Sequence, residues 1–227
     1  MIIFNRNREQ IKRIPYDFFL FLGISSMPMN LRLIIITAFM VTGLAISAQD
    51  FNGGLLGGLA ATQVSGDRLS GPNKAGIYAG AFVNRYFSLR SSVQMELNFI
   101  QKGSRSNPDS TNNYESYLLR LTYIELPIHY RYDFIERASF ETGLSLGVLI
   151  HSYEEANGYE WVSGPDFKPI DLSFNIGLFY NISDNLRINA RLSNSILAIR
   201  PHSAGQTYRW NKGQYNSVLS FVLFYDL

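Results

Sequence analysis

Cysteine is absent from this 227-residue chain. Its absence excludes disulfide bonds, thiolate metal sites and a lipoprotein anchor, which needs a cysteine at its processing site. The three histidines, His129, His151 and His202, are far apart and lack the spacing of metal ligands. Ser152 and Glu154 follow His151, but adjacent strand residues point to opposite faces and do not form a catalytic group. We expect no enzyme activity, no metal and no cofactor.

Long apolar runs are also scarce. The longest uncharged apolar run, residues 33–46, is shorter than the roughly 20 residues that a transmembrane helix needs. Arg32 precedes this run, and the small residues Ser47 and Ala48 follow it. A basic start, an apolar middle and a small-residue exit are typical of a secretory signal peptide. The pattern predicts cleavage after about Ala48.

This signal divides the chain into three parts. We expect residues 29–48 to be the signal peptide and residues 49–227 to be one β-barrel domain. Residues 1–28 are an extended N-terminus, or they lie upstream of the true start at Met27 or Met29. Neither leader segment is expected to belong to the fold.

Excess positive charge is absent from the predicted domain. Five of the 20 Lys and Arg residues and two of the 18 Asp and Glu residues precede residue 49, which leaves the domain near −1. Nucleic-acid binding therefore lacks an electrostatic basis.

The domain is rich in period-two alternation. From Ile170 to Tyr180, Ile, Leu, Phe and Tyr occupy the even positions, and Asp171, Ser173 and Asn175 occupy odd ones. Such a strand has one apolar and one polar face, and the apolar face points inward in a soluble barrel and toward lipid in a membrane barrel. Similar patterns and turn signals predict eight strands. They cover about residues 53–64, 74–86, 89–102, 115–132, 138–153, 170–181, 186–197 and 215–227.

The connections between these strands alternate in length. The short ones are residues 86–88, 133–137 and 182–185, and the long, polar ones are 65–73, 103–114, 154–169 and 198–214. Outer-membrane barrels have short periplasmic turns and long extracellular loops. The sequence therefore predicts an all-β fold, an eight-stranded antiparallel up-and-down transmembrane β-barrel.

Aromatic residues gather near the predicted strand ends. The set near the short turns is Tyr86, Phe87, Tyr130, Tyr132, Phe134, Tyr180 and Tyr225. The set near the long loops is Phe99, Tyr117, Tyr153, Tyr159, Trp161, Tyr208 and Trp210. Two such belts are expected at the two membrane interfaces, although aromatic residues favour strands in general.

Charged residues on the polar faces would fill the lumen. An eight-stranded barrel is just wide enough for side chains to fill it, and buried charges must pair. The predicted lumen network is Arg90, Glu96, Arg120, Glu125, Glu141, Asp171, Arg187 and Arg191. Strand 115–132 departs from the alternation, and a β-bulge near Tyr123 would account for it. We expect this network to be structural.

Four segments carry a family resemblance. They are Gly57–Leu59 with Gln63–Asp67, Lys74–Phe82, Glu96–Ser104 and Tyr123–Pro127. Together they resemble the PorT-type outer-membrane β-barrel domain family, a porin-like family common in Bacteroidota. The resemblance covers about residues 50–227. It implies an exported outer-membrane barrel and no single activity.

Three classes of function remain open. A structural or interaction barrel would meet an extracellular or membrane protein through its loops, with Tyr159, Trp161, Tyr208 and Trp210 as candidate contacts. A small porin-like transporter is disfavoured by a charge-filled narrow lumen. A soluble lipocalin-like binder would need its apolar faces turned inward. We expect a monomeric barrel surrounded by outer-membrane lipid.

Overall fold

The alternating segments form β-strands throughout the part of the chain that the computed structural model describes, residues 51–66, 71–110, 112–161, 165–202 and 213–227. The strands are β1 (Phe51–Ser65), β2 (Lys74–Tyr86), β3 (Ser91–Ser106), β4 (Tyr117–Ile135), β5 (Ala138–Ala156), β6 (Tyr159–Glu160), β7 (Ile170–Asn181), β8 (Leu186–Ser195) and β9 (Tyr215–Asp226). These residues hold no helix that is long and apolar enough to cross a bilayer.

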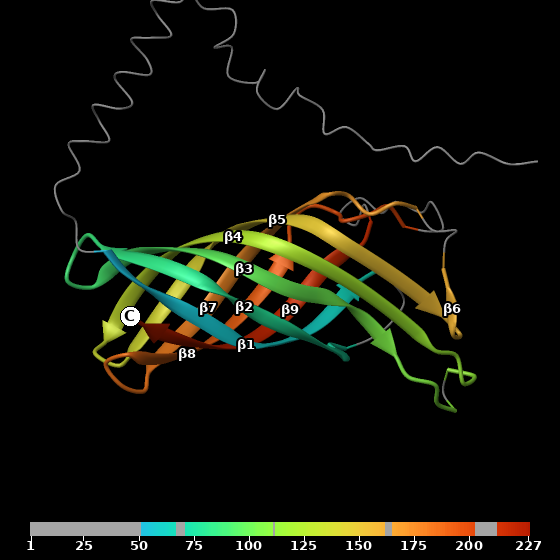
Figure 1. The fold of residues 1–227 in the computed structure, drawn as a ribbon, viewed down its shortest axis with the longest axis horizontal. Helices are drawn as coiled ribbons and strands as arrows, with labels where there is room; N and C mark the ends of the chain where they lie inside the picture. The colour runs from blue at the N-terminus through green and yellow to red at the C-terminus, as the bar shows by residue number, and fades with distance from the viewer. Residues whose placement is uncertain (1–50, 67–70, 111, 162–164, 203–212) are drawn as a thin grey trace, which may run out of the picture. The chain divides into compact units, whose positions relative to one another are not determined.

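Eight of the strands close into a barrel (Figure 1). Every pairing is antiparallel, β1 joins β9, and β4 joins β5 to complete the ring. Each of the eight long strands therefore has a partner on both sides, which satisfies the backbone without water, as a membrane requires. The short β6 pairs only with β5 and extends it as a hairpin. The predicted eight-stranded antiparallel barrel is confirmed.

The connections are sorted by length between the two ends of the barrel. Residues 87–90, 136–137 and 182–185 make the short turns, and the C-terminal strand ends beside the last of them (Figure 1). Residues 66–73, 107–116, 157–169 and 196–214 make the long connections at the other end. This distribution is the one predicted for an outer-membrane barrel, in which the short turns face the periplasm.

β7 shows which face of the sheet points outward. The side chains of Ile170, Phe174 and Leu178 are exposed, and those of Asp171 and Asn175 are buried inside the barrel. The other strands follow the same rule, so a continuous apolar surface covers the outside of the barrel. Such a surface faces lipid in a membrane barrel and rules out a soluble lipocalin-like arrangement.

The two ends of this outer surface differ in how many of the predicted aromatic side chains are exposed. All seven predicted near the short turns are exposed, namely Tyr86, Phe87, Tyr130, Tyr132, Phe134, Tyr180 and Tyr225. Near the long loops, Tyr159 and Trp161 are exposed, whereas Phe99, Tyr117 and Tyr153 are half-buried. Tyr208 and Trp210 lie outside the described residues. The described belt is therefore fuller at the short-turn end.

The departure of β4 from apolar–polar alternation has a different cause from the one expected. The register between β4 and β5 does shift between Thr122 and Tyr123, but the extra residue is Ile150 on β5. β4 keeps one inward face, which holds the buried Leu119 and Leu121 together with polar side chains. Near the long loops the interior is therefore mixed, because these apolar side chains share it with buried Lys102 and Arg200, and the expectation of a lumen filled by polar side chains alone was wrong there.

Candidate functional site

The interior of the barrel is the strongest candidate site, and it is built in layers along the barrel axis. The layer nearest the short turns is aromatic. Phe224 lies between Phe82 and Phe179, with ring centroids 5.2 and 4.9 Å away. The guanidinium of Arg187 lies over all three rings, and that of Arg131 lies 4.3 Å from the Phe179 centroid. Cations stacked on rings in this way fill the lumen at this level.

A charged cluster occupies the middle of the lumen. Arg191 on β8 donates from Nη2 to Glu96 Oε1 on β3 at 2.7 Å, and from Nε to Glu141 Oε1 on β5 at 2.7 Å. Two further bonds, from Nη1 to Glu96 Oε2 at 2.9 Å and from Nη2 to Glu141 Oε2 at 3.1 Å, make both contacts bidentate. All three side chains are buried. Such close pairing is needed to offset the free-energy cost of removing these charges from water.

Neutral side chains complete the bonding of both carboxylates. Gln94 and Asn98 donate to the two oxygens of Glu96 at 2.6 and 2.8 Å. Asn189 donates to Glu141 Oε1 at 2.8 Å, and the Tyr78 hydroxyl accepts a bond from Arg191 at 2.8 Å. Every carboxylate oxygen in the cluster therefore accepts at least one hydrogen bond.

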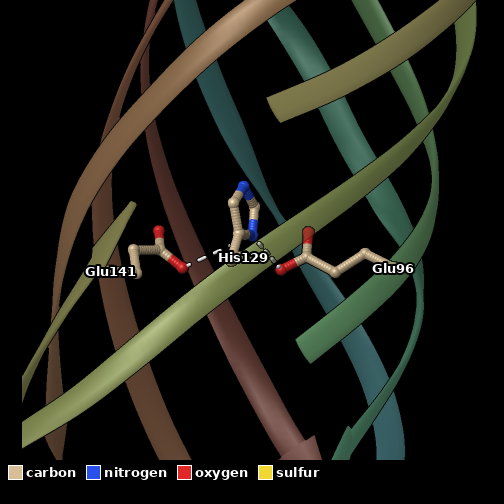
Figure 2. A group of neighbouring side chains, drawn as sticks. All are labelled: Glu96, His129 and Glu141. Atoms are coloured by element: carbon tan, nitrogen blue, oxygen red, sulfur yellow. Dashed lines mark ion pairs between the residues drawn. The ribbon is translucent and has the colours of Figure 1, made fainter. Parts of the chain in front are cut away.

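His129 on β4 lies between the two glutamates (Figure 2). Its Nδ1 is 3.4 Å from Glu96 Oε1 and 3.6 Å from Glu141 Oε2, longer than ordinary hydrogen bonds. Its Nε2 is 3.0 Å from the side-chain amide of Asn175.

The same three residues have the donor set of a metal site. Ligand atoms of Glu96, His129 and Glu141 lie within 4.8 Å of one another, and His with carboxylates suits zinc. However, both oxygens that face His129 already accept bonds from Arg191 Nη2. A bound dication would have to share these oxygens with a guanidinium. We therefore interpret the group as an ion cluster that holds the barrel together.

A second charged group lies closer to the long loops. Lys102 on β3 contacts Glu125 on β4 at 2.5 Å and Asp171 on β7 at 3.0 Å. Asn216 on β9 donates to the same Asp171 oxygen at 2.8 Å. Four strands are thus linked across the lumen by one lysine and its neighbours.

Arg200, which follows β8, is buried at the long-loop end. Arg200 donates to both oxygens of Glu154 at 2.6 and 2.9 Å, and the Tyr117 hydroxyl donates to Glu154 at 2.6 Å. Glu154 lies near the outer end of β5, beyond its lipid-facing residues. Burial would raise the pKa of Glu154, but the bonds from Arg200 and Tyr117 outweigh burial and hold that pKa below its usual range. The Arg200 guanidinium also covers the Phe167 ring at 4.3 Å.

The structure places the predicted lumen residues in three groups. Glu96, Glu141 and Arg191 meet one another, and Glu125 and Asp171 meet through Lys102. Arg187 binds Asp226 at the short-turn end, with two bonds of 2.9 Å.

Two predicted lumen residues lie elsewhere, and their assignment to the network was wrong. Arg90 is exposed because it belongs to the turn before β3. Arg120 points outward because the odd-numbered residues of β4 face the lumen, and it lies opposite Tyr153 near the outer end of the barrel. An outward charge is tolerated where a strand extends beyond the bilayer.

Five buried basic residues were missing from the predicted network: Lys74, Lys102, His129, Arg131 and Arg200. The alternation places Lys102 on the same strand face as Glu96, and His129 on the same face as Glu125, although neither was counted in the network. Arg200 lies in a long connection, where no periodicity indicates an inward side chain.

Two of the four loop aromatics predicted as contacts, Tyr159 and Trp161, lie at the hairpin of β5 and β6, and Tyr208 and Trp210 lie outside the described residues. Asn157 and Gly158 have φ values of 52° and 80°, as a type I′ turn requires, and they join β5 to β6. Tyr159 is 80% exposed and Trp161 is 53% exposed. Asn157 is tied to Ser116 by two hydrogen bonds, from its backbone at 2.9 Å and to its side chain at 2.8 Å.

Comparison with solved structures finds similar barrels of low sequence identity. Ail, the attachment invasion locus protein of Yersinia pestis, is 13% identical over 78% of this chain and 99% of its own, with a TM-score of 0.44. Its complex with the heparin analogue sucrose octasulfate has the same identity and coverage and a TM-score of 0.46. Neisserial surface protein A is 12% identical over 78% of this chain and 97% of its own, with a TM-score of 0.47.

Comparison at the level of sequence families is more decisive. No curated protein matches the chain. A family model described as outer membrane protein beta-barrel domain matches residues 47–199, more than half of the sequence. The lipid-facing apolar surface and the closed antiparallel ring agree with that match. The chain therefore belongs to the outer membrane protein β-barrel domain family and is located in the outer membrane.

Proposed function

We propose that the protein is a sealed outer-membrane barrel that acts through its long-loop end and conducts no solutes. The observation that carries this proposal is the bond from Arg191 on β8 to Glu96 on β3, which crosses the lumen. β2, β1 and β9 separate these two strands around the ring. With the aromatic layer on one side and the Lys102 group on the other, this link supports a structural or interaction role over porin-like transport.

The hairpin of β5 and β6 is the proposed contact element. Its turn is bonded through Asn157 to Ser116, the residue before β4, so it presents Tyr159 and Trp161 from a fixed base. Exposed aromatic residues on a rigid element are typical anchors of protein interfaces. We propose an extracellular or membrane protein as the partner and a monomeric barrel as the display scaffold, without enzymatic activity.

The finer family assignment and the processing of the chain belong to the same proposal. The four motifs in β1, β2, β3 and β4 support a PorT-type barrel within the broader family. The basic start, the apolar run over residues 33–46 and the small residues after it support a signal peptide over residues 29–48 and a mature domain over 49–227. Mass spectrometry of the protein from outer membranes would test this: a first residue well away from Gln49 would contradict the processing.

Site-specific photo-crosslinking on intact cells tests the contact element. A photoreactive residue in place of Tyr159 should give one discrete adduct, because the hairpin would lie against its partner. The same residue in place of Tyr114, which is exposed in a different long loop, is the matched control and should give none. Equal adducts at both positions, or none at Tyr159, would contradict the proposed role of the hairpin.

A further inference from the structure

The short-turn mouth of the barrel holds a cavity of about 570 Å³. This volume is within the roughly 300–1,000 Å³ range of sites that bind small molecules. Ends of β2, β4, β7 and β8 contribute to its wall, including Asn84, Arg131, Asn181 and Arg187. The cavity lies at the opposite end from the hairpin of β5 and β6, so it is independent of the proposed function.

Arg131 is an incompletely paired cation in this wall. Its side chain is only 2% exposed, yet its one ion pair among the described residues, to Asp133, is long, at 4.0 Å. Its bonded partners are neutral, Gln94 at 3.1 Å and Ser139 at 3.3 Å, and its Nε has no partner among the described residues. Arg187 beside it is satisfied by two bonds to Asp226. A buried cation without a direct carboxylate partner is costly, so an incoming anionic oxygen would be stabilised there.

Hydrogen-bond acceptors accompany this cation. The side-chain oxygens of Asn84 and Asn181 are buried and accept no bond from any residue that the structure describes. Asp184 and Glu136 add carboxylates to the same wall. The mouth therefore combines the buried guanidinium of Arg131, and the exposed one of Arg137, with several acceptors. A matching ligand must bring both an anionic oxygen and N–H donors.

We propose that this mouth binds the C-terminal end of a short periplasmic peptide. The terminal carboxylate would contact Arg131, and the backbone N–H groups would donate to Asn84 and Asn181. Proteins that recognise peptides often bind the terminal carboxylate and also form hydrogen bonds with the peptide backbone. Inorganic phosphate fits less well, because it has no N–H donors and its extra charge would face Asp184 and Glu136.

Calorimetric titration of the protein purified from outer membranes, in phosphatidylcholine nanodiscs, tests this proposal. The probes are N-acetyl-trialanine with a free carboxylate, its C-terminal amide, and inorganic phosphate. The free acid should bind at least tenfold more tightly than the amide, and phosphate should not displace it. Equal binding of acid and amide, displacement by phosphate, or no saturable binding at millimolar acid would overturn the proposal.

Substitutions separate the site from general effects of charge. Arg131→Met should abolish the preference for the acid, whereas Arg90→Gln, an exposed arginine at the same end but outside the cavity wall, should keep it. Heat-modifiable gel mobility checks folding. If Arg131→Met does not fold, Asn84→Asp provides the decision: a carboxylate in the wall should repel the acid and remove its tenfold preference over the amide. Unaltered preference in a folded variant would overturn the proposal.

Discussion

Arg191 and Glu96 are joined across the lumen by two bonds, of 2.7 and 2.9 Å, although three strands separate them around the ring. No backbone hydrogen bond connects β8 to β3, so the side chains alone make this link. Because Glu141 binds the same guanidinium, β3, β5 and β8 are held at fixed distances. The cluster is therefore a brace of the barrel as well as a filling of its interior.

Removal of Arg191 should strongly destabilise the barrel. Arg191→Met leaves two buried carboxylates without their common cation, and breaking such a pair costs about 3–5 kcal/mol. Urea unfolding in lipid vesicles, followed by tryptophan fluorescence, measures the change. Arg120→Met, at an exposed outward position, is the control and should stay within about 0.5 kcal/mol. Similar losses in both variants would contradict the role of the cluster.

Gly177 should be needed to make room for this cluster. It lies opposite Arg191 on β8 and Glu141 on β5, and an added Cβ would be 2.5 Å from Glu141 Oε1. Gly177→Val should lower the free energy of unfolding by about 1–3 kcal/mol through overpacking. At Gly57 an added Cβ meets nothing within 4 Å, so Gly57→Val should have little effect in the same unfolding assay. A tolerated valine at 177 would show that the cluster packs loosely.

Acid should weaken the ion pair between Glu154 and Arg200 at the long-loop end. The pKa of Glu154 is lowered in the folded protein, so its ion pair with Arg200 stabilises the fold above the carboxyl's unfolded pKa, about 4.3. This stabilisation is lost as the pH falls through the lower folded pKa. Glu154→Gln should therefore be less stable than the native protein at pH 7, with the difference shrinking in acid. A difference in urea midpoint that is independent of pH would contradict this account.

The cysteine-free sequence allows a direct test of topology. Tyr159→Cys places a single thiol on the exposed hairpin, and Ser183→Cys places one in a short turn. A membrane-impermeant maleimide should label the first in intact cells and the second only after the outer membrane is permeabilised. Labelling of the Ser183→Cys variant in intact cells would invert the orientation.

Most of the fold was predictable because its determinants are local. In β7 the alternation from Ile170 to Tyr180 determines which face is apolar and which is polar. The alternation of short and long connections indicates a membrane barrel, in which the apolar face points outward. Asn157 and Gly158 are also a local turn signal, yet the strand after them has only two residues and was not predicted. The bulge was placed near Tyr123 but on the wrong strand, since strand pairing decides which partner holds the extra residue.

The partners inside the lumen were less predictable, because they depend on register and on strands far apart in sequence. Glu96 and Arg191 could be placed on polar faces, but their contact depends on strands that face each other across the ring. Arg120 was misplaced because β4 carries apolar residues on its inward face, so polarity alone gave the wrong side. The aromatic layer with Arg131 depends likewise on three-dimensional packing.

The measurement that tests the sealed barrel most directly is ion conductance across a planar lipid bilayer that holds the purified protein. The native protein should give no stable conductance steps, because the aromatic layer, the Arg191 cluster and the Lys102 group fill the lumen. A variant with Glu96, Glu141 and Arg191 all replaced by alanine, checked for folding by gel mobility, shows whether the assay detects an emptied lumen. Stable steps from the native protein would contradict the account.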